Sequence, residues 1–385
     1  MLLFSLFDPT APSEDFFSWK FMQLAATNLG PAVRPALLAL LAAALATPLV
    51  IWAANRTGLL SHPSRERDIH TRPVPYGGGL AMYVAFAAAS LVFLRHDPKV
   101  PGLLILGAAT VVVFLVDDGL GIPALVKLAL QAVIAVAAVT LFGFHIHFLL
   151  VFPFLQVHDL GLLILPVTVV WVLGMQNTTN LLDGVDGLAA GVVGVTALVL
   201  LIASAGRQPD VVALAAALAG ACAGFLLFNF HPARIFMGDS GAYLLGLLLA
   251  LLAVQGVAKV AIVAAVAVPV LAMAVPITDT ALSIVRRHRN GQAFTHADAK
   301  HIHHLLLEAG LTQRQTCLLF YCTSGILGAA GLTAFGHRRV LVIAIVLMLV
   351  LLSTVLGDRL RISTRRVPAP LGRMMRQLLV GRVAR

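Results

Sequence analysis

Long apolar runs recur along the whole chain, and they constrain its fold more than any other feature. Each run holds about 15–25 residues, mostly Leu, Ala, Val and Ile, and a helix needs roughly 20 to cross the hydrocarbon core of a bilayer. These residues do not alternate between apolar and polar as the strands of a membrane barrel do. Only 11% of all residues are charged, against about 25% in soluble domains. The sequence therefore predicts an all-α integral membrane protein and excludes a soluble single-domain enzyme, a disordered chain and a fibrous protein.

Eleven of the runs are candidate transmembrane helices. They cover residues 35–54, 77–94, 101–116, 123–142, 160–175, 187–204, 211–228, 241–255, 260–283, 315–335 and 340–356. The sequence shows no internal repeat and no linker to a second domain. We therefore expect one polytopic domain at 35–356, preceded by an extracytoplasmic or interfacial segment at 1–34 and followed by a basic tail at 357–385.

Basic residues predict the orientation of the chain. Eighteen of the 27 Lys and Arg residues fall in one set of loops, which lie at 55–76, 117–122, 176–186, 229–240, 284–314 and in the tail from 357. The positive-inside rule places this set in the cytoplasm and the N-terminus outside. Contact with anionic lipid then explains the net charge of +10, and with no nucleic-acid motif in the sequence we expect no nucleic-acid partner.

The polar segments best suited to chemistry lie in the same loops, so we expect an active site that faces the cytoplasm. Asp117 and Asp118 end one span in the segment VDDGLG. Adjacent carboxylates repel each other unless a cation is near, so this pair suits a divalent metal or a general base, with a solvated helix end as the alternative. Lys127 opens the next span, either as a phosphate contact or as a snorkelling side chain.

Asparagine and aspartate recur at every third position in the segment MQNTTNLLDGVDGLAAG. These residues, Asn177, Asn180, Asp183 and Asp186, share one face if the segment is helical. An oxygen-rich face suits Mg²⁺, whereas an ordinary turn is the alternative.

Three further segments add polar candidates. In FNFHPARIFMGDSGAYLLG, Asp239 opens an apolar helix whose free amides favour phosphate, with a plain N-cap as the alternative. In the loop containing HADAKHIHH, His301, His303 and His304 lie near basic residues, which favours an anion site over zinc because no HExxH pattern is present. A basic loop with His70 and Arg72 precedes YGGG and could contact the substrate, with membrane anchoring as its alternative role.

Acidic metal ligands, basic anion ligands and an apolar bundle together predict phosphoryl transfer between a soluble pyrophosphate donor and a lipid phosphate.

At these motifs the chain resembles the polyprenyl-phosphate N-acetylhexosamine-1-phosphate transferases. VDDGLG with the following KLALQ, NTTNLLDGVDGLAAG, FNFHPARIFMGDSGAYLLG and HADAKHIHH match successive cytoplasmic motifs of that family, and the resemblance covers roughly residues 35–356. These enzymes transfer a sugar 1-phosphate from a UDP-sugar to undecaprenyl or a related polyprenyl phosphate, release UMP and require Mg²⁺ or Mn²⁺. The resemblance implies a multi-pass protein of the bacterial inner membrane with a UDP-N-acetyl sugar and a polyprenyl phosphate as partners. A homodimer is left open.

The resemblance also implies a role for each residue. Asp239 and Asn180 would bind the metal, and one of Asp117 and Asp118 would deprotonate the lipid phosphate. Phe236 would stack on uracil, and Lys127 would hold phosphate. The remaining expected site residues are Asp183, His301, His303 and His304 among the catalytic groups, and Asn177, Asp186, Asn229, His70 and Arg72 among the substrate contacts.

Two motifs indicate which sugar donor the chain uses. HIHH and HTRPVPYGGG resemble the branch that uses UDP-N-acetylglucosamine, while FTHADAKH departs from the Ser-Pro that many relatives carry there. The same chemistry with UDP-N-acetylmuramoyl-pentapeptide, or with another UDP-N-acetylhexosamine, is the close alternative. A secondary transporter is a remote one, because transport sites usually lie near the membrane midplane.

Overall fold

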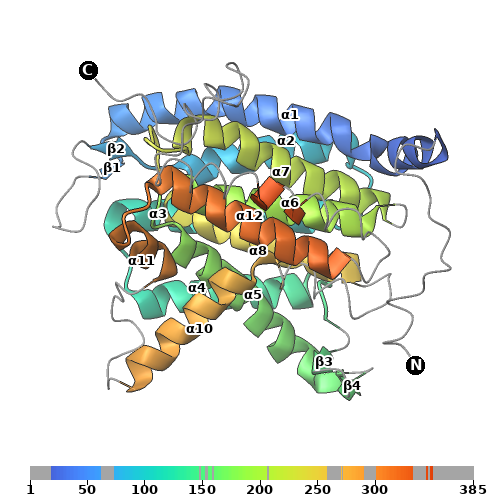
Figure 1. The fold of residues 1–385 in the computed structure, drawn as a ribbon. Helices are drawn as coiled ribbons and strands as arrows, with labels where there is room; N and C mark the ends of the chain where they lie inside the picture. The colour runs from blue at the N-terminus through green and yellow to red at the C-terminus, as the bar shows by residue number, and fades with distance from the viewer. Residues whose placement is uncertain are drawn as a thin grey trace.

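The computed structural model describes residues 19–61, 73–146, 149–151, 155–157, 160–205, 208–257, 270, 272–289, 301–332, 344–345 and 347–349. These residues are mostly helical (Figure 1). The helices are α1 (Trp19–Thr57), α2 (Gly78–Phe93), α3 (Val100–Leu120), α4 (Ala124–Thr140), α5 (Ile164–Leu182), α6 (Leu188–Ser204), α7 (Pro209–Asn229), α8 (Gly238–Val257), α10 (Ala274–Arg289), α11 (Ile302–Glu308) and α12 (Gln313–Leu332). The 3₁₀ helix η2 (Gly161–Leu163) leads into α5, and two short antiparallel hairpins complete the described elements, β1 (Leu60–Ser61) with β2 (Val74–Pro75) and β3 (Leu149–Val151) with β4 (Leu155–Val157).

The helices confirm the predicted all-α membrane class. Within the described residues, six helical segments are long and apolar enough to cross a membrane, and α2, α4 and α6 are shorter apolar helices. Nine of the eleven predicted spans fall on these helices. The predicted span at 260–283 meets α10 only from residue 274, and most of the span at 340–356 lies outside the described residues. The count of eleven spans stays a prediction.

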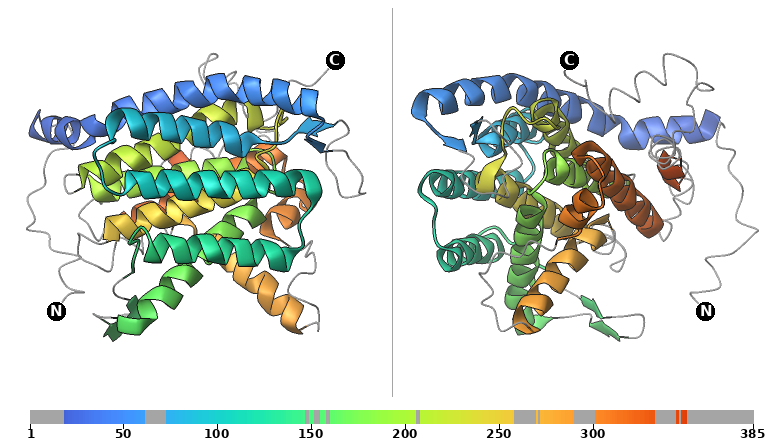
Figure 2. Two further views of the ribbon diagram at one scale, coloured as in Figure 1. Left: turned by 180° about the vertical axis from the view of Figure 1, so that it is seen from behind. Right: turned by 60° about the vertical axis from the view of Figure 1, so that its left-hand side comes forward.

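Helix α8 lies at the centre of the bundle, where its side chains are almost all buried. Helix α1 crosses one side of the molecule and packs along α7 and α2, and Figure 2 shows α1, α2, α3 and α4 one below another. The outer face of α1 exposes leucines at every fourth position: Leu37, Leu41, Leu45 and Leu49 are each more than half exposed. Lipid covers such a stripe in a membrane protein, so the exposure is not a packing defect.

The β1–β2 hairpin marks the end of the bundle where polar segments selected from the sequence meet, and we call it the hairpin end. The backbone N–H of Phe236 donates to the carbonyl of Pro75 at 2.8 Å, and the amides of Gly78 and Gly79 donate to the carbonyls of Phe236 and Met237. A Cβ atom on Gly79 would collide with the backbone nitrogen of Gly241. The first turns of α2 and α8 therefore approach as closely as two backbones can, which only glycine permits.

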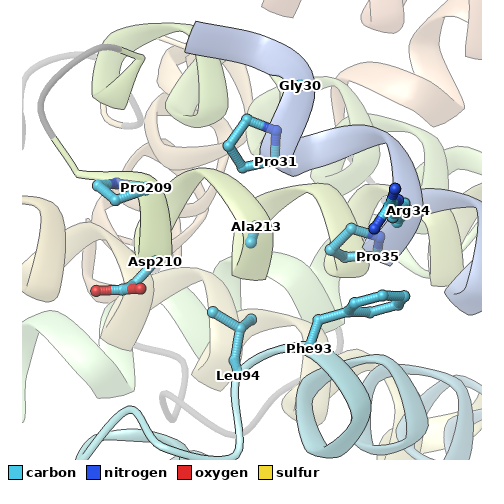
Figure 3. Close-up of a pocket in the computed structure, with 9 residues that line it drawn as sticks. All are labelled: Gly30, Pro31, Arg34, Pro35, Phe93, Leu94, Pro209, Asp210 and Ala213. Carbon is cyan, nitrogen blue, oxygen red and sulfur yellow. The ribbon is translucent and has the colours of Figure 1, made fainter. Parts of the chain in front are cut away.

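An open pocket of about 410 Å³ lies between α1, α2 and α7, far along α1 from the hairpin end. Figure 3 shows Arg34 and Asp210 at its rim among apolar and proline side chains. The pocket shares no residue with the polar cluster described next, so it does not contribute to that site.

Candidate functional site

A lysine joins two aspartates at the hairpin end. The Nζ atom of Lys127, in the first turn of α4, lies 2.6 Å from Oδ2 of Asp239 and 2.7 Å from Oδ2 of Asp117. Asn180, in the last turn of α5, donates from Nδ2 to Oδ1 of Asp239 at 2.8 Å. The structure thus brings together four residues that the sequence singled out, one each from α3, α4, α5 and α8.

Asp118 caps the first turn of α8 from another helix. Its Oδ1 atom accepts the backbone N–H of Asp239 at 2.7 Å, and its Oδ2 atom accepts the hydroxyl of Ser240 at 2.8 Å and the amide of Ser240 at 3.4 Å. The N-terminal amides of a helix have no partner within the helix and carry partial positive charge, so a carboxylate satisfies both needs. The cap that the sequence suggested for Asp239 is supplied instead by Asp118.

Asp183 follows the last residue of α5 and adds a further carboxylate. Among the described residues no hydrogen-bond donor contacts its side chain. Burial, reinforced by the charges of Asp239, Asp118 and Asp186, raises the pKa of Asp183 well above its ordinary value. A carboxylate in this environment is stabilised by a cation. We call Asp117, Asp118, Lys127, Asn180, Asp183 and Asp239 the carboxylate cluster.

The carboxylate cluster fits a divalent cation that binds together with a phosphate substrate. It contains four carboxylates and one ammonium group, so its charge is negative. Within the part of the chain that the structure describes, no three His, Cys, Asp or Glu side chains converge as a closed metal cage. Mg²⁺ is usually held by one or two carboxylates, with water and substrate phosphates as its other ligands. Asp239 could supply the carboxylate oxygen for such an ion. Asn180 could supply an amide oxygen if its side chain rotated, because its Nδ2 atom now faces Asp239.

Helix α5 places Asn177 and Asn180 on one face, as their spacing predicts, but the helix ends at Leu182. Asp183 and Asp186 therefore lie in the following turn and do not continue the face. Nδ2 of Asn177 donates to Oε1 of Gln131 at 2.7 Å, one turn along α4 from Lys127. A polar strip thus runs from the carboxylate cluster into the bundle.

Asp186 and Asn229 lie in the interior and hold loops together. The amide of Asn229, 2% exposed, accepts the N–H of Gly187 at 3.0 Å and donates to the carbonyl of Ile235 at 2.9 Å. Asp186 accepts the N–H of Ala233 at 3.0 Å and contacts Nδ1 of His231 at 2.8 Å. These contacts favour a role in positioning the loops, while direct contact with a nucleotide stays a prediction.

Phe236 lies beside a tyrosine that the sequence analysis did not select. The ring centroids of Phe236 and Tyr76 are 5.8 Å apart at a tilt of 53°, and the Tyr76 hydroxyl donates to Ser61 Oγ at 3.1 Å. The signal that could have found Tyr76 was its place before the three glycines of YGGG. His70 and Arg72 lie outside the described residues.

Two of the three selected histidines are buried beside α10. His301 and His303 stack with parallel rings, whose centroids are 5.6 Å apart. Nδ1 of His301 lies 3.0 Å from Oδ2 of Asp279 on α10, a residue that was not among the selected site residues. His304 is in α11, but its side chain is outside the described set.

Comparison with known proteins places this arrangement among transferases. Residues 100–257 match the model of glycosyl transferase family 4. The chain is 32% identical over 326 residues to a probable undecaprenyl-phosphate N-acetylglucosaminyl 1-phosphate transferase of Bacillus subtilis, covering 84% of this chain and 90% of that protein. It is 34% identical over 377 residues to a decaprenyl-phosphate N-acetylglucosaminephosphotransferase of Mycolicibacterium smegmatis, covering 86% and 91%. A phospho-N-acetylmuramoyl-pentapeptide-transferase of Heliobacterium modesticaldum is 38% identical, but over only 45% of this chain and 57% of that protein.

Proposed function

Because this chain belongs to glycosyl transferase family 4, with the polyprenyl-phosphate N-acetylhexosamine-1-phosphate transferases, we propose that it transfers N-acetylglucosamine 1-phosphate from UDP-N-acetylglucosamine to a polyprenyl phosphate such as undecaprenyl phosphate. UMP is the other product. The observation that carries the proposal is the carboxylate cluster around Lys127, which gathers anionic and cationic groups at one end of an apolar bundle.

The reaction exchanges one phosphorus–oxygen bond for another. An oxygen of the lipid phosphate attacks the β-phosphorus of the UDP-sugar, and the bond from that phosphorus to the oxygen shared with the α-phosphate breaks. The electron pair of that bond leaves with UMP, and the lipid carries the sugar on a pyrophosphate. A phosphate monoester has its second pKa near 6, so its attacking oxygen needs little help in losing a proton at pH 7. Positioning and charge neutralisation are therefore the main tasks of the protein.

Lys127 and Asp239 serve these tasks most directly. Lys127 is an ammonium group whose two carboxylate partners hold it in place, and it can bind a phosphate oxygen. Asp239 and Asn180 would hold Mg²⁺, with Mn²⁺ as the alternative ion. When bound, the metal would neutralise charge on the transferred phosphoryl group. Asp118 already accepts three hydrogen bonds from α8, so Asp117 is the better candidate to contact the lipid phosphate.

Different observations support the choice of sugar donor and the side of the membrane that the site faces. Relatives named for N-acetylglucosamine match over most of both chains, whereas the muramoyl-pentapeptide relative matches over less than half of this one. The excess of Lys and Arg in one of the two sets of loops, the set that also contains the segments of Asp117, Asp183 and Asp239, supports a site that faces the cytoplasm, with the N-terminus outside.

We expect purified protein to release UMP when given UDP-N-acetylglucosamine, undecaprenyl phosphate and Mg²⁺, and to release none when either the lipid or the metal is left out. UMP measured by chromatography checks this result. Release with UDP-N-acetylmuramoyl-pentapeptide alone would keep the chemistry and change the donor. Absence of UMP with every UDP-N-acetylhexosamine, from protein that unfolds cooperatively, would contradict the proposal.

A further inference from the structure

A buried carboxylate on α10 lies outside the carboxylate cluster. The Asp279 side chain is 6% exposed. It lies within α10, after the turn that contains a proline and before the apolar residues of the next turns. Its Oδ2 atom lies 3.0 Å from Nδ1 of His301, and its two oxygens lie 3.3 and 3.2 Å from the backbone nitrogen of Ile302. Burying a carboxylate lowers the stability of the fold unless the carboxylate is hydrogen-bonded, so these contacts offset the cost of burying Asp279.

Asp279 fixes where α11 begins. Ile302 is the first residue of this helix, whose seven residues are too few to be stable alone. Its free N-terminal amide finds its acceptor on another helix, much as the first turn of α8 finds Asp118. The position of His301, directly before α11, therefore depends on α10.

The same carboxylate selects one form of the His301 ring. An ionised carboxylate can only accept hydrogen bonds, so Nδ1 of His301 is the nitrogen that carries hydrogen. The Nε2 atom is then the ring nitrogen left for a substrate. Without the partner, a neutral imidazole is free to adopt the other tautomer.

His303 connects His301 with the turn that carries Asp183. The His301 ring stacks on His303 at an interplanar angle of 3°. A Cβ atom added to Gly184 would lie 2.8 Å from Nε2 of His303, so that ring rests on the Gly184 backbone. Asp279, His301 and His303 thus form one row from α10 to the edge of the carboxylate cluster.

We propose that Asp279 is a positioning residue for the transfer reaction, which holds His301 in the Nδ1–H tautomer and in the orientation that presents Nε2, as a hydrogen-bond acceptor, to a hydroxyl or amide N–H of the donor's sugar. This inference rests on the proposed function, because His301 is the group that would touch the substrate. Asp279 acts through His301 and does not contact the reacting atoms.

Asp279→Asn separates this role from a purely structural one. Asn keeps an acceptor for the Ile302 amide, so the thermal midpoint should remain within about 2 °C of wild type. Its amide group can donate to Nδ1 and favour the wrong tautomer of His301, so kcat should fall about 30-fold. In a His301→Ala background the same change should alter kcat less than about twofold, because two residues that act as one unit are not additive. Asp210→Asn, an exposed aspartate at the far pocket, is the matched control and should leave kcat unchanged.

Histidine NMR tests the contact without relying on turnover. In protein labelled with ¹³C and ¹⁵N at histidine, the resonances lost in His301→Ala identify this ring. They should report the Nδ1–H form in wild type and the Nε2–H form in Asp279→Asn. Equal losses of kcat from Asp279→Asn in the wild-type and His301→Ala backgrounds, or the Nε2–H form in wild type, would overturn the positioning role. A wild type that releases no UMP with any donor would instead overturn the proposed function, and the positioning role with it, whatever tautomer the spectra show.

Discussion

An Asp239→Asn variant will fold normally and lose about a thousandfold in kcat. The side chain keeps its size and one acceptor, so contacts with Lys127 and Asn180 can be rearranged in part. It loses the charge that would hold a divalent cation, and such a cation contributes several kcal/mol of transition-state stabilisation. Each 1.36 kcal/mol is a factor of ten in rate, which gives a loss of about 10³. UMP release under saturating substrates measures it.

The Asp210→Asn variant again serves as control, because it removes one carboxylate far from the cluster. Thermal unfolding of both variants should match wild type. Raising the Mg²⁺ concentration should recover part of the lost rate if Asp239 binds metal. An Asp239→Asn protein with more than a tenth of wild-type kcat would remove Asp239 from the reaction centre.

An Asp118→Ala variant will lose both stability and activity. Three hydrogen bonds from the first turn of α8 lose their acceptor, and a helix cap alone is worth about 0.5–2 kcal/mol. Buried donors left without partners cost about 1–3 kcal/mol each. We expect the free energy of unfolding to fall by about 3 kcal/mol. Activity should fall by about a hundredfold or more, because Asp239 sits on the turn that Asp118 holds.

Ser240→Ala is the matched comparison, since it removes the 2.8 Å bond from the serine hydroxyl to Asp118 and its 3.3 Å contact with the Met237 carbonyl, and leaves both backbone amides with their acceptor. It should cost about 1 kcal/mol and leave most of the activity. Denaturant titration in detergent, followed by the fluorescence of the tryptophans, gives the free energy of unfolding of both variants. UMP release gives their activity. If Asp118→Ala were as stable as wild type but inactive, the carboxylate would act on substrate and not as a cap.

The sequence predicted the class of fold because bilayer solvation acts on each segment separately. Length and apolar content suffice to place α3, α7 and α8, and no tertiary contact is needed. Spacing also predicted that Asn177 and Asn180 share a face of α5. Where α5 ends was not predictable from spacing alone, because Asp183 and Asp186 continue the same period beyond the last helical residue.

The pairing of distant residues could not be predicted in the same way. Asp118 looked like half of an acidic pair, yet it caps a helix that begins about 120 residues later. Asp279 was predicted to lie near the cytoplasmic end of its span, but nothing in the sequence pairs it with His301, which belongs to another segment. Such contacts depend on how helices pack, and helix packing is fixed by the whole bundle and not by any one span.

The close approach of Gly79 and Gly241 has a consequence for how the protein is made. The two glycines are separated by about 160 residues, which a ribosome adds in about 8–30 s at 5–20 residues per second. During that interval α2 is inserted while the carbonyls of Phe236 and Met237, which accept the amides of its first turn, do not yet exist. Water or an insertion partner must satisfy those amides until α8 emerges. Ribosome-bound chains that end before residue 236 should therefore expose the β1–β2 segment to protease, and chains long enough to include α8 should protect it.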